Sequence, residues 1–186
     1  MRYLVVIIAL LCFWSCQEEM QPKPKAFLAL EYSKAEYKKV DVGCAYTFEI
    51  NTMAKVKPSR VNNPCWVDIE YPELNGTLFI TYQEVNGNLD ALLRDGQKLP
   101  LQHTKKADVI EGDQYLNPSH NTYGMFYEVE GNAASQAQFY VTDSINHFLT
   151  GAIYFRATPN FDSIYPAAAY LKNDIKQLME TVEWQD

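Results

Sequence analysis

Hydrophobic and polar residues alternate along much of the first half of the chain, which is the period-two pattern of half-buried β-strands. The alternation is clearest over 46–50, 65–71 and 77–82, where aromatic and branched aliphatic residues take every second position. Asn75-Gly76 lies between the last two segments and is a strong hairpin signal, because both residue types tolerate positive φ. Two shorter apolar segments are also expected to be strands, namely 26–32 and 53–56.

The last third of the chain predicts three strands followed by a long helix. The strands are rich in aromatic and β-branched residues, are separated by short turns and are expected to form an antiparallel meander over 123–130, 136–142 and 148–155. Apolar residues then recur every three to four positions, which predicts a helix capped by Asp162 or Ser163, with Pro166 in its first turn and its end near Glu180. Residues 182–184 are expected to be extended.

Between these two groups of strands, leucines stand among polar residues. Asn88 is expected to cap a helix that begins at Leu89 and is interrupted at Gly96. A second helical piece is expected over 101–110, because apolar residues recur there at helical spacing. Residues 111–121 are interpreted as a loop.

Strands, helix, strands and helix in this order predict an α+β fold, an antiparallel sheet flanked by helices, in a single globular domain over residues 26–186. The chain has 186 residues of which 47% are hydrophobic, which excludes a disordered chain. Its formal net charge is −7 and it has no basic block, so nucleic-acid binding is not expected. Most of its aromatic residues fall in strands, and a surplus on an outer sheet face would mark a surface for a partner.

The first 15 residues have the composition of an export signal. An apolar run of twelve residues ends at Trp14 and is too short to span a bilayer, which takes about 20 residues. Ser15 followed by Cys16 is the ending of a lipoprotein signal, so we expect cleavage before Cys16 and acylation of its thiol. Residues 16–25 would then form a polar tether. The alternative is a plain secretory signal cut near Ser15.

Cys44 and Cys65 are the two cysteines that remain after processing. An even pair in an exported protein suggests a disulfide. However, each cysteine opens a strand pattern, and the starts of two hairpin strands lie at opposite ends, beyond the ~7 Å Cα limit of a disulfide. A bridge therefore needs a bend or an intervening crossing, and two separately buried thiols are the alternative.

The search for catalytic chemistry is mostly negative. The chain contains no nucleotide-binding, phosphate-binding, zinc-protease or serine-hydrolase motif, and neither a cofactor nor a metal is expected. Asp143, Ser144 and His147 are residue types that hydrolases use, but Asp and Ser are also turn formers and His147 can simply begin the next strand. Ser144 and Ser163 follow Asp and precede Ile, a pattern similar to the O-glycosylation acceptor of Bacteroidota; the alternatives are a turn and a helix N-cap.

Several segments must be considered together, and they cover almost the whole mature chain: Pro22-Lys23-Pro24-Lys25, 44–50, 65–72, 75–78, 103–108, 130–135, 142–144, 147–155 and the closing helix through Trp184. In combination they resemble the gliding motility lipoprotein GldD family of Bacteroidota. The resemblance implies an envelope lipoprotein needed for gliding motility and for the associated type IX secretion machinery, and it carries over no catalytic residue. The C-terminal order of strand, long helix and Trp is also similar to the PsbP/Mog1 type of α/β/α sandwich.

These observations favour a protein that is not an enzyme but an assembly or stabilising component, which binds other envelope proteins of the gliding and type IX secretion apparatus. Acylated Cys16 would hold it at a membrane, on the periplasmic side, with surface display as an alternative suggested by Gln17-Glu18-Glu19. Two other hypotheses stay open. One is an envelope hydrolase that uses Asp143, Ser144 and His147, and the other is a carrier of a lipid or small ligand with a deep apolar pocket.

Overall fold

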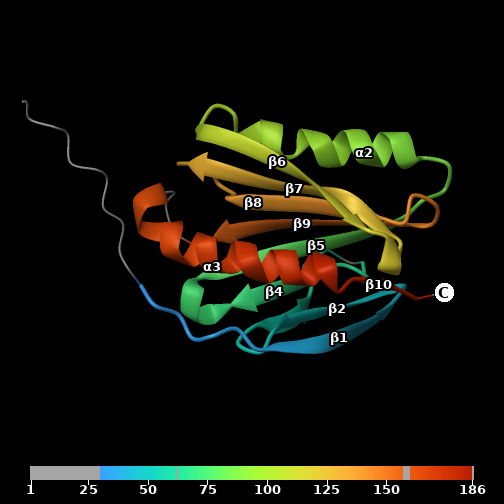
Figure 1. Ribbon diagram of the computed structural model, residues 1–186, viewed down its shortest axis with the longest axis horizontal. Coiled ribbons are helices and arrows are strands. Elements are labelled where there is room, and N and C mark those ends of the chain that lie inside the picture. Colours follow the sequence, from blue (N-terminus) through green and yellow to red (C-terminus); the bar gives the residue numbers. More distant parts are fainter. Residues whose placement is uncertain (1–29, 62, 157–159, 186) are drawn as a thin grey trace, which may run out of the picture.

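A computed structural model describes residues 30–61, 63–156 and 160–185 of the chain (Figure 1). The expected signal peptide (1–15), the acylated Cys16, the tether (16–25) and the first part of the expected strand 26–32 lie outside these residues.

The described residues form two antiparallel sheets and two α-helices. The larger sheet has the strand order β3-β4-β5-β9-β8-β7-β6, and the smaller has the order β1-β2-β10. The strands are β1 (Tyr37–Cys44), β2 (Tyr46–Asn51), β3 (Lys55–Pro58), β4 (Val67–Tyr71), β5 (Gly76–Glu84), β6 (Ala107–Asn117), β7 (Thr122–Gly131), β8 (Ala137–Thr142), β9 (His147–Phe155) and β10 (Glu183–Trp184). The helices are α2 (Leu89–Lys98) and α3 (Phe161–Glu180), with short 3₁₀ turns η2 (Pro72–Leu74), η3 (Pro100–His103) and η4 (Pro118–His120).

The larger sheet lies between the two helices (Figure 1). On one face Leu149 packs in the main core with Leu171 and Ile175 of α3. On the other face Phe148, the preceding residue of β9, packs with Leu92 of α2. Since successive side chains of a strand point to opposite faces, the two helices cover opposite faces, and the layers are helix, sheet and helix. We call the side covered by α2 the outer face.

The smaller sheet lies beside the larger one and is tied to α3 by a buried carboxyl group. Asp174 of α3 is only 3% exposed. Its carboxylate accepts hydrogen bonds from the Tyr37 hydroxyl of β1 at 2.9 Å and from the Asn51 amide of β2 at 3.0 Å. Burial raises the pKa of Asp174 above its usual range, although these hydrogen bonds oppose the shift.

The α+β class, the antiparallel meander β7-β8-β9 and the end of α3 at Glu180 are confirmed. The hairpin between β4 and β5 is confirmed as well, with Asn75 at φ 52°. The extended C-terminal piece is also present, as β10. In α3, by contrast, the expected capping was wrong. The residue before the helix is Asn160, and Pro166 stands inside the helix, beyond its first turn.

Two exposed strands were missed by the prediction. Residues 30–32 are not a strand, and the first strand is β1, in which only the short stretch Val40, Val42 and Cys44 alternates with exposed residues. The helix expected over 101–110 and the loop expected over 111–121 were wrong, because most of this region forms β6. Both strands lie at sheet edges, where backbone pairing on one side holds them and their apolar side chains are at most half-buried.

Helix α2 passes through Gly96 instead of stopping there. A Cβ at Gly96 would lie 3.1 Å from the ring carbon Cδ1 of Tyr140 in β8. The missing side chain therefore lets the helix approach the outer face closely. This close packing compensates for the low helix propensity of glycine.

Candidate functional site

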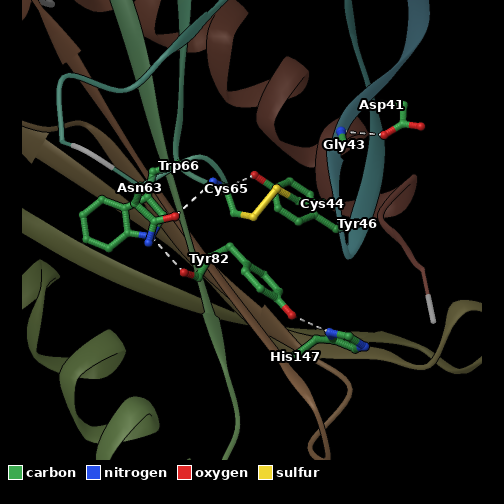
Figure 2. The surroundings of a disulfide bond; sticks show 9 residues. All are labelled: Asp41, Gly43, Cys44, Tyr46, Asn63, Cys65, Trp66, Tyr82 and His147. Carbon is green, nitrogen blue, oxygen red and sulfur yellow. Dashed lines mark hydrogen bonds between the residues drawn. A yellow bond between two sulfur atoms is a disulfide. The ribbon is translucent and has the colours of Figure 1, made fainter.

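The two sheets are joined by a disulfide (Figure 2). Cys44 ends β1, Cys65 lies two residues before β4, and their Cα atoms are 5.7 Å apart. Cys44 is in the smaller sheet and Cys65 leads into β4 of the larger one, and the chain crosses from one sheet to the other between β2 and β3. The geometric objection from a simple hairpin therefore does not apply, because the crossing supplies the required bend.

A row of aromatic side chains continues this junction from the disulfide to the end of the chain. The Tyr46 hydroxyl donates to the Cys65 carbonyl at 2.7 Å, and the Tyr46 ring stacks on Tyr82 with 5.3 Å between centroids. A 2.8 Å hydrogen bond joins the Tyr82 hydroxyl to Nδ1 of His147 (Figure 2). The His147 ring in turn stacks on Trp184 of β10, with 5.0 Å between centroids. Burial raises the pKa of Tyr46 and of Tyr82, so both hydroxyl groups stay protonated.

Asp143 and Ser144 lie in the turn between β8 and β9 and His147 begins β9, but the three residues are not arranged as a catalytic triad. Oδ1 of Asp143 accepts three backbone N–H bonds at 2.8–2.9 Å, from residues 145, 146 and 147. Nδ1 of His147 is bonded to Tyr82 instead of to the carboxylate, and Ser144 occupies the left-handed region at φ 68°. The arrangement supports the interpretation of these residues as a turn.

Asp143 is expected to stabilise the fold through its charge. Burial acts to raise the pKa of its carboxyl group, but the backbone N–H bonds outweigh burial and hold the pKa below its usual range. This stabilisation is complete above the unfolded pKa of about 4 and is lost as the pH falls through the lower folded value. We expect Asp143→Ala to lower the free energy of unfolding by about 2 kcal/mol at pH 7.

The measurement is urea unfolding of wild type and variant at pH 7 and at pH 3. The difference between them should shrink at pH 3, and a difference that stays constant would contradict the assignment. Asp143→Asn is the matched control, because it keeps an acceptor oxygen at this position but cannot titrate.

Two of the three histidines meet in one open cleft. His120 of η4 and His147 line it together with Asp143, Glu183 and Trp184, and its volume is about 420 Å³. His103 lies elsewhere, in η3. Within the ranges that the structure covers, no group of three or more His, Cys, Asp or Glu side chains could hold a metal ion.

A groove on the outer face is the most distinctive surface of the domain. It lies beside α2 over β5 and β9 and has a volume of about 320 Å³. Phe79 of β5 is 39% exposed and Tyr154 of β9 is 37% exposed, and their rings meet edge to face at 5.7 Å. The outer-face groove is formed mainly by apolar side chains, among them Phe79, Leu92, Leu99, Phe148, Ala152 and Tyr154.

The same two aromatic residues border a smaller, charged cavity of about 210 Å³ near β4. Glu70 forms ion pairs there with Lys57 at 2.6 Å and with Arg156 at 2.9 Å. The hydrogen bond from Lys57, followed by the charges of both cations, keeps the pKa of Glu70 below its usual range. The outer face therefore combines an apolar groove with a charged end.

Sequence reasoning did not identify this groove, although a signal was present. Phe79 stands between Leu78 and Ile80, at a position where the alternation of β5 points away from the main core. In β9, Tyr154 likewise follows the core residue Ile153 and points away from the main core. Large aromatic residues on the polar side of a strand indicate a contact surface.

The proposed O-glycosylation serines are both exposed. Ser144 lies in the β8–β9 turn, and Ser163 lies in the first turn of α3, where its hydroxyl donates to the Asn160 carbonyl at 3.0 Å. Their exposure is compatible with modification, which stays a proposal.

The chain is thus an α+β domain with aromatic residues exposed in a groove on one sheet face. None of the helices in the described part of the chain is long and apolar enough to cross a membrane. A model of the gliding motility lipoprotein GldD family matches residues 17–184, and the chain belongs to this family. A search of curated proteins found no match. Membership makes the protein a membrane-anchored lipoprotein of the cell envelope that takes part in gliding motility, as the resemblance implied.

Proposed function

We propose that the protein is a non-enzymatic assembly component of the gliding apparatus and of the associated type IX secretion machinery. It binds another envelope protein through the outer-face groove, while acylated Cys16 holds it at the periplasmic side of a membrane. The exposed pair Phe79 and Tyr154 is the observation that carries this proposal.

Aromatic residues are enriched in the cores of protein interfaces, because they bury a large area at a small cost in conformational entropy. Phe79 and Tyr154 have this character, since their rings pack on each other and both line the groove beside apolar side chains such as Leu92, Leu99 and Ala152. The charged side chains around Glu70 border the groove and would contribute specificity at its rim. The groove is open to solvent, which suits a protein segment better than a lipid cargo.

The test is the double variant Phe79→Ser with Tyr154→Ser. We expect at least a tenfold loss of the partner captured by crosslinking in the native membrane, since aromatic anchors at an interface centre cost about 2 kcal/mol or more each. Spreading on agar and secretion of type IX substrates should fall together. Folding should persist, because both side chains are partly exposed.

The matched control replaces two exposed apolar residues away from the groove, Leu30→Ser with Ile145→Ser, which are 54% and 70% exposed. It should keep capture, spreading and secretion. Full capture and normal spreading by the groove variant would remove the groove from the mechanism. Normal secretion together with lost spreading would remove only the link to type IX secretion.

A further inference from the structure

Strand β6 leaves one edge of the larger sheet open. It is the last strand in the sheet order, and it pairs only with β7. Along residues 109–117 no backbone hydrogen bond reaches any other described segment. In an antiparallel pair, alternate residues turn their N–H and C=O groups away from the partner strand. These groups of β6 therefore face solvent, where another strand can pair with them.

A bulge and a proline, two of the usual protections of an edge strand, are found only at the ends of β6. An irregularity in register lies between Ala107 and Val109, and Pro118 follows the strand. Between them there is neither proline nor lysine. The C-terminal part is held in place by α3, because the Tyr115 hydroxyl donates to the Met179 carbonyl at 2.9 Å. The open edge is thus long and already fixed in an extended conformation.

The charges of β6 indicate what kind of strand fits this edge. Glu111 and Asp113 are exposed and stand two positions apart, so both point to the same face as Tyr115, the face that carries α3. Neither of them forms an ion pair with a described residue, whereas the nearby Lys172 and Lys176 are both paired with Glu128. The opposite face of β6 carries uncharged residues, namely Gly112, Gln114 and Leu116.

A second copy of the chain is a poor match for this edge in the register that would pair the whole of β6 with itself. An antiparallel pair of two β6 strands centred on Gly112 would place Glu111 of each copy opposite Asp113 of the other. Like charges directly opposite one another destabilise a strand pair. The complementary strand instead has cationic residues at every second position and uncharged residues between them.

We propose that β6 binds an extended cationic segment of an envelope partner, which adds to the larger sheet as a further strand. Its lysine or arginine side chains lie opposite Glu111 and Asp113 on the α3 face, and its backbone pairs with the open edge of β6. This inference rests on the proposed binding role and names a second contact of the same partner, on a surface separate from the outer-face groove.

The probe is a fluorescent peptide, Thr-Lys-Val-Lys-Thr-Lys-Val-Lys-Thr, added to the full-length protein in detergent. Binding is measured by anisotropy at low and physiological salt, because exposed charge pairs weaken with ionic strength. Two further peptides are compared with it. One has Glu in place of each Lys, and the other has Pro in place of each uncharged residue, so that the charge is retained while alternate N–H donors are lost.

We expect the lysine peptide to bind, and the Glu and Pro peptides to bind at least tenfold more weakly. The variant Glu111→Lys with Asp113→Lys should lose about tenfold in affinity. Its matched control, Glu31→Lys with Glu73→Lys, makes the same change in net charge at exposed positions away from the edge and should lose less than twofold. Amide hydrogens of β6 should exchange more slowly when the lysine peptide is bound.

Equal binding of the lysine and Pro peptides would reduce the contact to charge attraction and overturn strand addition. Unchanged affinity in the edge variant, or dimers of the protein alone that are linked through β6, would also overturn it. The variant Phe79→Ser with Tyr154→Ser separates the two proposals. Peptide binding that survives in this variant supports the edge contact whether or not the groove captures a partner.

Discussion

Replacing Cys44 and Cys65 together with serine is expected to lower the free energy of unfolding by about 3 kcal/mol. The disulfide joins residues 21 positions apart and so closes a loop that contains β2 and β3. Cross-linking removes conformational freedom from the unfolded chain. In the chain-entropy model, closing a loop of this size stabilises the folded state by about 3 kcal/mol. The smaller sheet should also become easier to detach, since the disulfide is a second covalent link to the region before β4, in addition to the main chain between β2 and β3.

Guanidinium unfolding followed by tryptophan fluorescence measures this effect. Trp66 and Trp184 both lie at the junction, where the Trp66 indole donates to the Tyr82 carbonyl at 2.8 Å. Reductant should bring the wild type close to the variant and should leave the variant unchanged. A wild type that does not respond to reductant, with a variant equal to it in stability, would show that the disulfide contributes nothing.

Gly124→Ala is expected to destabilise the domain by about 3 kcal/mol or more. A Cβ at this position of β7 would lie 1.9 Å from the Tyr140 carbonyl oxygen and 3.0 Å from Cα of Val141. These are backbone atoms of β8, which pairs with β7 from residue 123 to residue 128, so the clash can be relieved only by separating the two strands. Because the reason is steric, every larger residue should be worse than alanine.

Thermal unfolding checks this prediction, and the midpoint should fall by roughly 6–12 °C. Gly112→Ala in β6 is the matched control. Its Cβ would meet only side-chain atoms, chiefly the ring of Tyr127 at 2.9 Å, and that ring is half-buried and can move. A loss at Gly112 as large as the loss at Gly124 would contradict the steric explanation.

The sequence predicts those parts of the fold in which one strand face is buried. β2, β4 and β5 have alternating residues because one side of each packs in the core. The alternation is weaker in β1 and β6, because their side chains are at most half-buried and backbone pairing along one edge helps to hold them in the sheets. Lys38 and Lys39 limit the alternation in β1 to the short stretch Val40–Cys44, and β6 contains the charged residues Glu111 and Asp113.

For the candidate surfaces, the sequence shows which residues are unusual but does not show how the fold brings them together. The cysteine pair was visible, but its bridging depends on the crossing between two sheets, which strand patterns do not reveal. Phe79 and Tyr154 could be identified as aromatic residues at strand positions that face away from the core. The groove beside them, however, exists only because α2 packs closely on Tyr140 at Gly96. Such tertiary contacts are not encoded in local periodicity.

The disulfide also bears on the order of events in the life of this lipoprotein. Thiols remain reduced in the cytosol, so the bond between Cys44 and Cys65 forms only after export. The newly made chain therefore lacks about 3 kcal/mol of stabilisation while it must stay unfolded enough to be translocated. The disulfide therefore adds a further covalent connection between the two sheets only in the envelope, where the proposed binding surfaces would act.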